Sequence, residues 1–199
     1  MKVVIIKYNA GNIKSVDYAL QRLGLTAAIT NKHEDILSAD KIIFPGVGEA
    51  STTMSYLKKN NLDTLIKQLK QPVLGICLGM HLMCEHSEES NTKCIGIYSE
   101  TVKLFRPEPG MENKTKVPQM GWNNIYNLKD GIFDSSMENK FFYFVHSYYV
   151  TEGQHTSAKC DYIIPFSAGL QRDNFYATQF HPEKSGKVGA KILENFIKL

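Results

Sequence analysis

The stretch "PVLGICLGMHLM", from Pro72 to Met83, places one cysteine between two glycines where a strand-like run changes into a helix-like run. The apolar residues up to Ile76 are typical of a buried strand, and those after Cys77 are typical of a helix. A cysteine that stands on such a tight turn needs glycines beside it, because side chains at Gly75 and Gly79 would collide with the turn. The pattern therefore has the form of a nucleophile elbow with cysteine in the place of serine.

A cysteine at this kind of elbow is well placed to act as a nucleophile. It lies at the N-terminus of the following helix, where the helix dipole and the free N–H groups favour the thiolate. The N–H of Leu78 also becomes a donor for an oxyanion. The two glycines have a second interpretation, since they would equally ease the packing of a helix on a sheet around a buried cysteine. The five residues from Gly75 to Gly79 fit both interpretations.

The segments before the elbow alternate between strand and helix patterns. Short apolar runs, typical of strands, occupy residues 2–8, 26–30 and 41–46. Helical spacing of apolar residues occurs between the first two runs, and again at residues 51–59 and 62–69. This alternation predicts right-handed crossovers and a mostly parallel sheet with helices on its faces.

The pattern changes after about Glu85. Five segments have strand character and are joined by short polar turns: residues 101–105, 123–128, 141–150, 162–170 and 174–180. A final helix with an apolar stripe is predicted over residues 185–199. We expect one α/β domain over residues 1–199, with an antiparallel or mixed sheet portion attached to the parallel one in the C-terminal half.

Composition and charge exclude several classes of protein. The 199 residues carry a net charge of +3 without a basic block, which argues against binding to nucleic acid or to a membrane surface. The N-terminal apolar run is too short for a signal peptide or a membrane span. The four cysteines, Cys77, Cys84, Cys94 and Cys160, form no C-x-x-C pair and match no zinc spacing. We expect a cytoplasmic protein with free thiols and no metal or cofactor.

A thiolate nucleophile needs a general base, and the segment "QFHPEKS", Gln179 to Ser185, is the best candidate. It contains His181 at the end of a strand-like run and Glu183 two residues later. A carboxylate at that distance can orient the imidazole, which is the role of the third member of a catalytic triad. Glu183 alone is equally typical of an acidic residue in the first turn of the last helix. Together with the elbow, the catalytic interpretation is favoured.

A second oxyanion donor is expected from another strand end. The segment "FPGVGEAS", Phe44 to Ser51, has two glycines around Val47 that let the backbone turn its amides toward a neighbour. It lacks the Gly-Lys-Ser/Thr ending of a phosphate loop, and Glu49 would repel phosphate. An oxyanion strand is therefore the favoured interpretation.

Cys77, His181 and Glu183, in this order, resemble the triad of class I glutamine amidotransferases. The resemblance covers essentially the whole chain, because its segments follow the order and the spacing of that family. These segments are "YNAGN", "PGVGE", "GICLGM", "VPQMGWN", "YFVHSY" and "QFHPEKSG". "MGWN" and "YFVHSY" are most similar to the branch of glutaminase subunits in histidine biosynthesis, rather than to the anthranilate or GMP synthase glutaminases.

The resemblance implies a flavodoxin-like α/β domain and a cofactor-free reaction. Cys77 would attack the carboxamide of L-glutamine, with His181 as base and then acid and with Glu183 orienting it. A thioester would form, ammonia would leave, and water would release glutamate. The N–H groups of Val47 and Leu78 would form the oxyanion hole, the first of them after a backbone rearrangement.

The resemblance also implies a set of glutamine-binding positions. Matching residues for the α-amino and carboxylate groups of the substrate are Gly48, Glu89, Ser147 and Tyr148. The family usually has a glutamine four residues after the cysteine, where it touches the substrate, but this chain has His81. An imidazole can donate or accept a hydrogen bond, so we expect His81 to remain a glutamine-binding residue with altered affinity or pH dependence.

A partner protein is implied as well. Members of this branch form a heterodimer with a cyclase (β/α)8 barrel and pass ammonia to it through a tunnel, since ammonia in neutral water is mostly protonated. The cyclase then makes imidazole glycerol phosphate and an aminoimidazole carboxamide nucleotide. Positions at or near that interface match Asn12, Trp122, Tyr143 and Lys184. Asn12 is equally typical of a helix N-cap, and Trp122 and Tyr143 of core or strand residues.

Three alternatives stay open at the level of sequence. The same chemistry serves paralogues that amidate surface-sugar precursors with their own barrel partner. A non-catalytic subunit that only scaffolds its synthase would retain the fold, although the complete triad argues against it. A general cysteine hydrolase of the same fold would show no dependence on glutamine.

Overall fold

The computed structural model describes residues 1–8, 11–110 and 115–199. Two residues of the segment "YNAGN", Asn9 and Ala10, lie outside the described part of the chain.

The N-terminal half of the chain and one strand near its C-terminus form a parallel sheet. Its strands are β1 (Val3–Ile6), β2 (Ala27–Thr30), β3 (Lys41–Phe44), β4 (Val73–Ile76) and β13 (Phe175–Thr178). They lie in the order β2-β1-β3-β4-β13, and each neighbouring pair is parallel. This order is that of a flavodoxin-like doubly wound sheet, as predicted from the resemblance.

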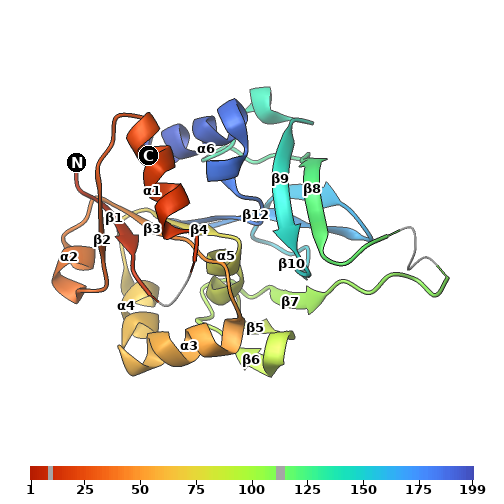
Figure 1. Ribbon diagram of the computed structural model, residues 1–199, viewed down its shortest axis with the longest axis horizontal. Coiled ribbons are helices and arrows are strands. Elements are labelled where there is room, and N and C mark those ends of the chain that lie inside the picture. The colour runs from red at the N-terminus through yellow and green to blue at the C-terminus, as the bar shows by residue number, and fades with distance from the viewer. Residues whose placement is uncertain (9–10, 111–114) are drawn as a thin grey trace.

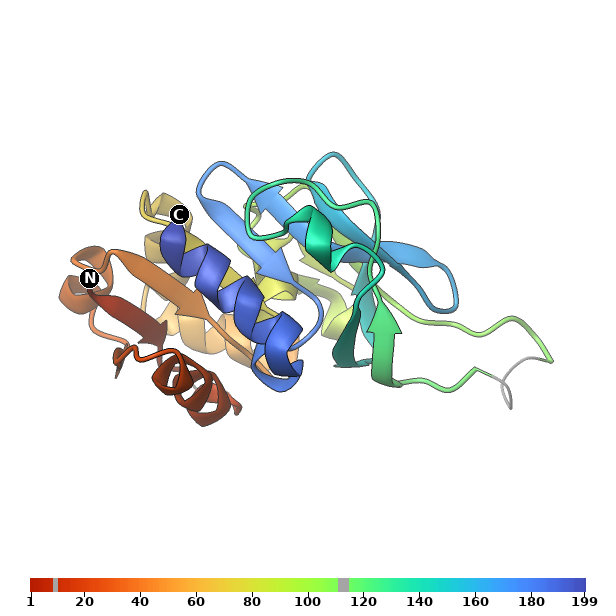
Figure 2. The ribbon, with the colours of Figure 1, turned by 90° about the horizontal axis from the view of Figure 1, so that it is seen from above.

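Helices cover both faces of this sheet (Figure 1). One face carries α1 (Ile13–Arg22) and α6 (Gly186–Lys198), and Figure 2 shows α6 lying across the strands. The other face carries α2 (His33–Leu37), α3 (Ala50–Lys59), α4 (Leu62–Gln68) and α5 (Leu78–Met83). In β1, Val3 and Ile5 face the first layer whereas Val4 and Ile6 face the second. Strands that are buried on both faces have continuous apolar sequences, and for this reason the strands could be predicted from the sequence.

The C-terminal half extends the sheet with mostly antiparallel strands. They are β5 (His86–Ser87), β6 (Thr92–Lys93), β7 (Thr101–Leu104), β10 (Tyr148–Val150), β11 (Thr156–Asp161) and β12 (Pro165–Arg172). A separate antiparallel pair, β8 (Gln119–Asn124) and β9 (Phe141–His146), packs beside it (Figure 1). Short 3-10 turns are η1 (Glu89–Asn91), η2 (Ser135–Met137) and η3 (Pro182–Lys184). The mixed character predicted for this half is confirmed.

One predicted strand divides into two. The sequence favours a single strand over residues 141–150, but the chain changes sheets at Ser147: β9 pairs with β8, whereas β10 pairs with β7 and β12. The Ser147 carbonyl accepts a hydrogen bond from the Phe105 N–H at 3.0 Å. Both halves of the run are apolar, so its composition holds no signal for the change of partner strand.

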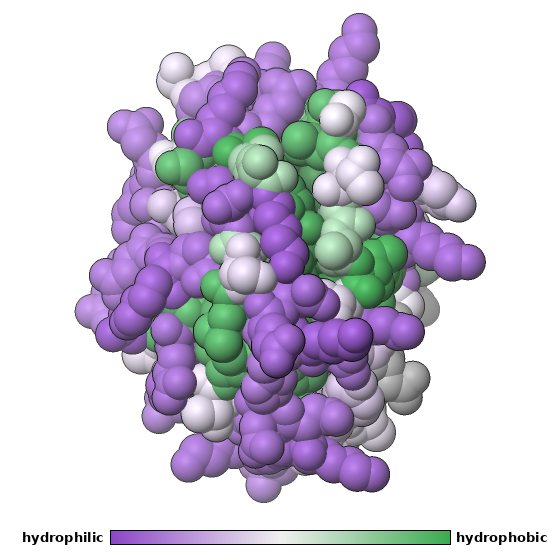
Figure 3. Space-filling model, turned by 90° about the vertical axis from the view of Figure 1, so that its left-hand side faces the viewer, coloured by the Kyte–Doolittle hydropathy of each residue, from purple (hydrophilic) through white to green (hydrophobic). Residues whose placement is uncertain are grey.

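The edge strand β2 lies on the side of the molecule shown in Figure 3. Apolar atoms there lie in separate areas between hydrophilic side chains. β2 has only four residues, and a short edge strand surrounded by polar groups is a common protection against pairing with other chains.

Candidate active site

The elbow around Cys77 lies between β4 and α5. Cys77 has φ 52° and ψ −107°, a conformation that non-glycine residues adopt at a cost, and its N–H donates to the Thr178 carbonyl at 2.7 Å. A Cβ at Gly79 would overlap the carbonyl oxygen of Phe44, and one at Gly75 would overlap the Met83 side chain. Both glycines are therefore required by the close approach of α5 to the sheet. Cys77 is 7% exposed and opens into a pocket.

His181 and Glu183 form a buried hydrogen-bonded pair after β13. The His181 Nδ1 lies 2.7 Å from Glu183 Oε1. Because a carboxylate can only accept, Nδ1 carries the proton of this bond, and Nε2 is the nitrogen left for proton exchange. The His181 backbone N–H donates to the Tyr143 carbonyl at 2.9 Å, which ties the base to β9.

The charges of Cys77 and Glu183 act on the His181 imidazole. Burial disfavours the imidazolium, but the neighbouring Cys77 thiolate and then Glu183 outweigh that effect and raise the pKa of His181 to about 10. Nε2 is buried and has no hydrogen-bond partner among the described residues. Within the described residues, Nε2 is therefore the imidazole nitrogen available to move a proton.

Asn12 contacts the same pair. Its Nδ2 donates to Glu183 Oε1 at 2.5 Å and lies 3.4 Å from His181 Nδ1. Asn12 stands at the N-cap position of α1 with φ 71°, but its side chain makes no capping hydrogen bond. From the sequence, Asn12 was interpreted either as a residue at the partner interface or as a helix N-cap. The structure adds a contact with the carboxylate that orients the base, which residue spacing could not reveal because the two positions are 171 residues apart.

The two predicted oxyanion donors are not aimed at a common point. The Leu78 N–H donates to the Gly46 carbonyl at 3.3 Å. That carbonyl belongs to the Gly46–Val47 peptide, and in a planar trans peptide the N–H points opposite to the C=O. The Val47 N–H is therefore turned away from Leu78. The Tyr8 hydroxyl donates to the adjacent Pro45 carbonyl, which adds a second contact to this backbone arrangement.

A pocket lies directly over Cys77 and collects the predicted substrate-binding residues. Its lining consists of Val47, Gly48, Cys77, Leu78, His81, Glu89, Val145, His146, Ser147 and Tyr148. All five positions predicted to bind glutamine are therefore brought together around the nucleophile. Burial raises the pKa of Glu89, although the Ala50 N–H donates to its Oε2 at 2.9 Å.

Two functional candidates escaped the sequence analysis. Gln179 lies two residues before His181, accepts a hydrogen bond from His81 Nε2 at 2.8 Å, and has its own Nε2 at 3.9 Å from Cys77 Sγ. Gln179 is the first residue of the segment "QFHPEKS", which contains His181. Its position so close to the base was the sequence signal that could have identified it. Burial lowers the pKa of His81 to about 4, so its imidazole is neutral near pH 7.

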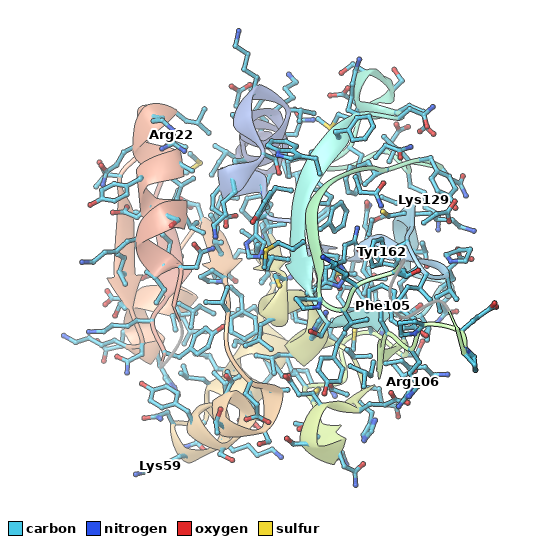
Figure 4. All side chains as sticks on the ribbon, turned by 45° about the vertical axis from the view of Figure 1, so that its right-hand side comes forward. Arg22, Lys59, Phe105, Arg106, Lys129 and Tyr162 are labelled. Atoms are coloured by element: carbon cyan, nitrogen blue, oxygen red, sulfur yellow. The ribbon has the colours of Figure 1, made fainter. Side chains whose placement is uncertain are left out.

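His146 is the second candidate. Its Nδ1 donates to the Tyr148 carbonyl at 2.7 Å, and its Nε2 is buried without a partner among the described residues. Its ring packs 5.5 Å from Phe105, which Figure 4 shows close to Tyr162 beside β8 and β9. Burial lowers the pKa of His146 to about 3, so it is a neutral acceptor at the pocket wall.

The predicted interface residues lie around an exposed apolar face. Trp122 on β8 and Tyr143 on β9 are cross-strand neighbours with ring centroids 6.1 Å apart. Lys184 Nζ lies 5.9 Å from the Tyr143 ring centroid. Trp122 is 56% exposed, as are Met120 and Phe141 at 66% and 57%. Trp122 is therefore a surface residue and not part of the core.

Within residues 1–8, 11–110 and 115–199, no three His, Cys, Asp or Glu side chains gather as metal ligands would. In the same ranges, no helix has both the length and the apolar character of a bilayer span.

Comparison with known proteins identifies the family. The model of the family "Glutamine amidotransferase class-I" matches residues 4–199, and the chain therefore belongs to that family. A solved glutamine amidotransferase structure shares the fold, with a TM-score of 0.74 and 15% identity over 98% of this chain and 97% of the other.

Relatives with higher identity carry one particular name. The chain is 59% identical to imidazole glycerol phosphate synthase subunit HisH of Bacteroides fragilis (strain YCH46), over 100% of both chains. It is 42% identical to the subunit HisH of Vibrio parahaemolyticus, over 100% of this chain and 98% of the other.

Proposed function

We propose that this chain is the glutaminase subunit of imidazole glycerol phosphate synthase in histidine biosynthesis. It hydrolyses L-glutamine to glutamate and ammonia and passes the ammonia to a cyclase subunit. The observation that carries the proposal is the Cys77 elbow, whose N–H donates to the Thr178 carbonyl just before the buried His181–Glu183 pair, beneath a pocket lined by the predicted glutamine-binding residues. Full-length relatives named as this subunit support the choice of pathway.

The chemistry follows from the charge state of the site. The Cys77 thiolate attacks the carboxamide carbon, and the electron pair of the C=O bond moves onto oxygen. His181 Nε2 gives its proton to the leaving nitrogen, the C–N bond breaks, and ammonia leaves a thioester. Neutral His181 then takes a proton from water, and the resulting hydroxide attacks the thioester. The C–S bond breaks, glutamate leaves, and the thiolate–imidazolium pair is restored.

The pocket supplies complementary groups for the two ends of an amino acid. Glu89 is the carboxylate for the α-amino group. The backbone at Gly48 and the hydroxyls of Ser147 and Tyr148 supply donors for the α-carboxylate. Burial, with Glu89 nearby, raises the pKa of Tyr148, so its phenol keeps the proton that such a bond requires.

The oxyanion hole requires one rearrangement before turnover. The Gly46 carbonyl occupies the Leu78 N–H, which would otherwise face the developing oxyanion. Rotation of the Gly46–Val47 peptide removes that carbonyl, frees the Leu78 donor and brings the Val47 N–H to the same side. A subunit in the resting arrangement hydrolyses glutamine slowly, which suits an enzyme whose ammonia is useful only when a partner is bound.

The exposed face of β8 and β9 is the proposed docking surface for the cyclase (β/α)8 barrel. It joins the apolar side chains of Met120, Trp122 and Phe141 next to the catalytic pocket. Asn12 and Lys184 lie at its border, near Glu183 and Tyr143 respectively. Docking here would cover apolar surface and keep ammonia out of water, where it would be protonated.

A coupled assay tests this function. Glutamate release is measured with the purified chain alone, with the cyclase subunit, and with the cyclase loaded with its nucleotide substrate. We expect little release from the chain alone and strong stimulation in the loaded complex, with imidazole glycerol phosphate formed in step. Full activity of the isolated chain would contradict the docking model. Absence of glutamine hydrolysis under all three conditions would contradict the proposed function.

A further inference from the structure

We propose that Gln179 is a further catalytic residue, whose amide N–H donates to the Cys77 thiolate, and that His81 is the positioning residue that orients this amide. The inference rests on the proposed function, because it concerns the same nucleophile. It assigns His81 a task beyond lining the substrate pocket.

The contacts form a continuous chain from the helix to the sulfur. His81 Nε2 lies 2.8 Å from Gln179 Oε1, and Gln179 Nε2 lies 3.9 Å from Cys77 Sγ. Gln179 is fully buried, and its backbone N–H donates to the Ala168 carbonyl at 2.9 Å. His81 lies on α5, one turn beyond Cys77, and its own N–H donates to the Cys77 carbonyl at 3.1 Å. Both ends of the glutamine side chain are thus held by fixed elements.

The orientation of the amide decides its effect on the sulfur. A neutral imidazole has one N–H, and Nε2 carries it when Gln179 Oε1 accepts. That contact leaves the NH₂ end of Gln179 toward Cys77. If the amide were reversed, its carbonyl oxygen would face the thiolate and repel it. Because the site is buried, both the attraction and the repulsion are stronger than in water.

Other polar groups near Cys77 donate their protons to backbone carbonyls, so they do not donate to the sulfur. The Tyr8 hydroxyl donates to the Pro45 carbonyl, and the His146 Nδ1–H donates to the Tyr148 carbonyl. Across the described ranges, Gln179 is the side chain that hydrogen-bonds to the Cys77 sulfur.

The test measures the thiolate directly and needs neither glutamine nor the cyclase. The full chain is treated with iodoacetamide across a pH series, and alkylation is followed on the peptide that contains Cys77, separately from the buried Cys84, Cys94 and Cys160. Four single variants and one double variant are compared with the natural chain. His81→Met removes the donor, and His81→Gln keeps one. Gln179→Met removes the amide, and Gln179→Glu places a carboxyl group there without changing the size of the side chain.

We expect His81→Met and Gln179→Met each to raise the midpoint of the alkylation profile by about one pH unit, which is about a tenfold loss of rate below the midpoint. His81→Gln should stay close to the natural profile. The double variant His81→Met with Gln179→Met should shift no further than either single variant, since both remove the same contact. Gln179→Glu should raise the midpoint more than Gln179→Met.

Specific results overturn the inference. An unchanged midpoint in both Gln179 variants would exclude the contact with the thiolate. A shift in Gln179→Met with none in His81→Met would exclude the positioning role of His81. Equal shifts in His81→Gln and His81→Met would mean that the donor is irrelevant. Circular dichroism and thermal unfolding of each variant separate these results from misfolding, and the His81→Gln and His81→Met pair still decides the matter if a Gln179 variant fails to fold. Because alkylation requires no turnover, failure of the proposed glutaminase function would leave this test readable.

Discussion

The two sides of the Cys77 sulfur differ in how far they are assembled. On the base side, His181, Glu183 and Asn12 are already in contact, with distances of 2.5 and 2.7 Å at the carboxylate. On the oxyanion side, the Leu78 N–H is held by the Gly46 carbonyl. The comparison indicates that proton transfer is prepared in advance, whereas stabilisation of the tetrahedral intermediate waits for one peptide to turn.

The difference has a structural origin. The base side consists of buried side chains on packed elements, and side chains in such positions have one well-defined arrangement. The oxyanion side is backbone in a glycine-flanked loop, where Gly48 has φ +137° and Gly46 packs against the Tyr8 hydroxyl. Glycine permits backbone conformations that other residues avoid, so the peptide that follows Gly46 can rotate at low cost.

Removal of the nucleophile should have the largest effect. With Cys77→Ala, we expect glutamine-dependent synthesis by the complex to fall by about ten thousandfold or more, while synthesis from added ammonium salts is retained. Both activities are measured as imidazole glycerol phosphate formed. Loss of the ammonium-dependent activity as well would mean that Cys77 is structural.

The same variant should change the titration of the base. The Cys77 thiolate is the foremost influence that raises the pKa of His181 to about 10 against the opposing effect of burial. In Cys77→Ala that negative charge is gone and burial remains, so the pKa of His181 should fall well below about 10. NMR of the imidazole protons during a pH titration measures it. An unchanged midpoint would place His181 out of reach of the sulfur.

Loss of the Glu183 carboxylate should impair proton transfer by His181 without affecting the oxyanion side. In Glu183→Gln the partner of His181 Nδ1 can also act as a donor, so the imidazole loses its fixed tautomer and much of its charge stabilisation. We expect the turnover number for glutamine to fall by about a hundredfold or more, with a smaller change in the Michaelis constant. A variant with normal turnover would show that Glu183 serves only as an acidic residue ahead of α6.

A substitution at Tyr8 should affect the oxyanion side of the site and leave the base side unchanged. Tyr8→Phe removes the hydroxyl that donates to Pro45, and one such hydrogen bond contributes roughly 1 kcal/mol to the resting backbone arrangement. Glutamate release by the isolated chain should therefore rise by about fivefold, with little change in the fully stimulated complex. Asn31 donates to the Tyr56 hydroxyl far from the site, so Tyr56→Phe is a matched control. Equal effects of the two substitutions would contradict the role of Tyr8.

The sequence allowed prediction of the elements that depend on local pattern. The alternation of strands and helices up to Cys77 and the elbow itself have signals in neighbouring residues, whereas the glutamine-binding positions were implied by the resemblance to the family. The division of residues 141–150 between two sheets had none, because both parts are equally apolar. The contacts of Asn12 with Glu183 and of His81 with Gln179 join positions far apart in the chain, so they required the fold. The direction of the Gly46 carbonyl depends on backbone dihedrals that residue type leaves free at glycine.

The hydrogen bond from the His181 amide to the Tyr143 carbonyl has a thermodynamic consequence. It connects the imidazole to β9, where the Tyr143 ring lies beside Trp122 of β8 on the exposed apolar face. A protein that binds to this face and a ligand that fixes the imidazole would then stabilise the same position of the strand. Such coupling is reciprocal, so the factor by which docking raises affinity for glutamine must equal the factor by which bound glutamine tightens the association of the two subunits.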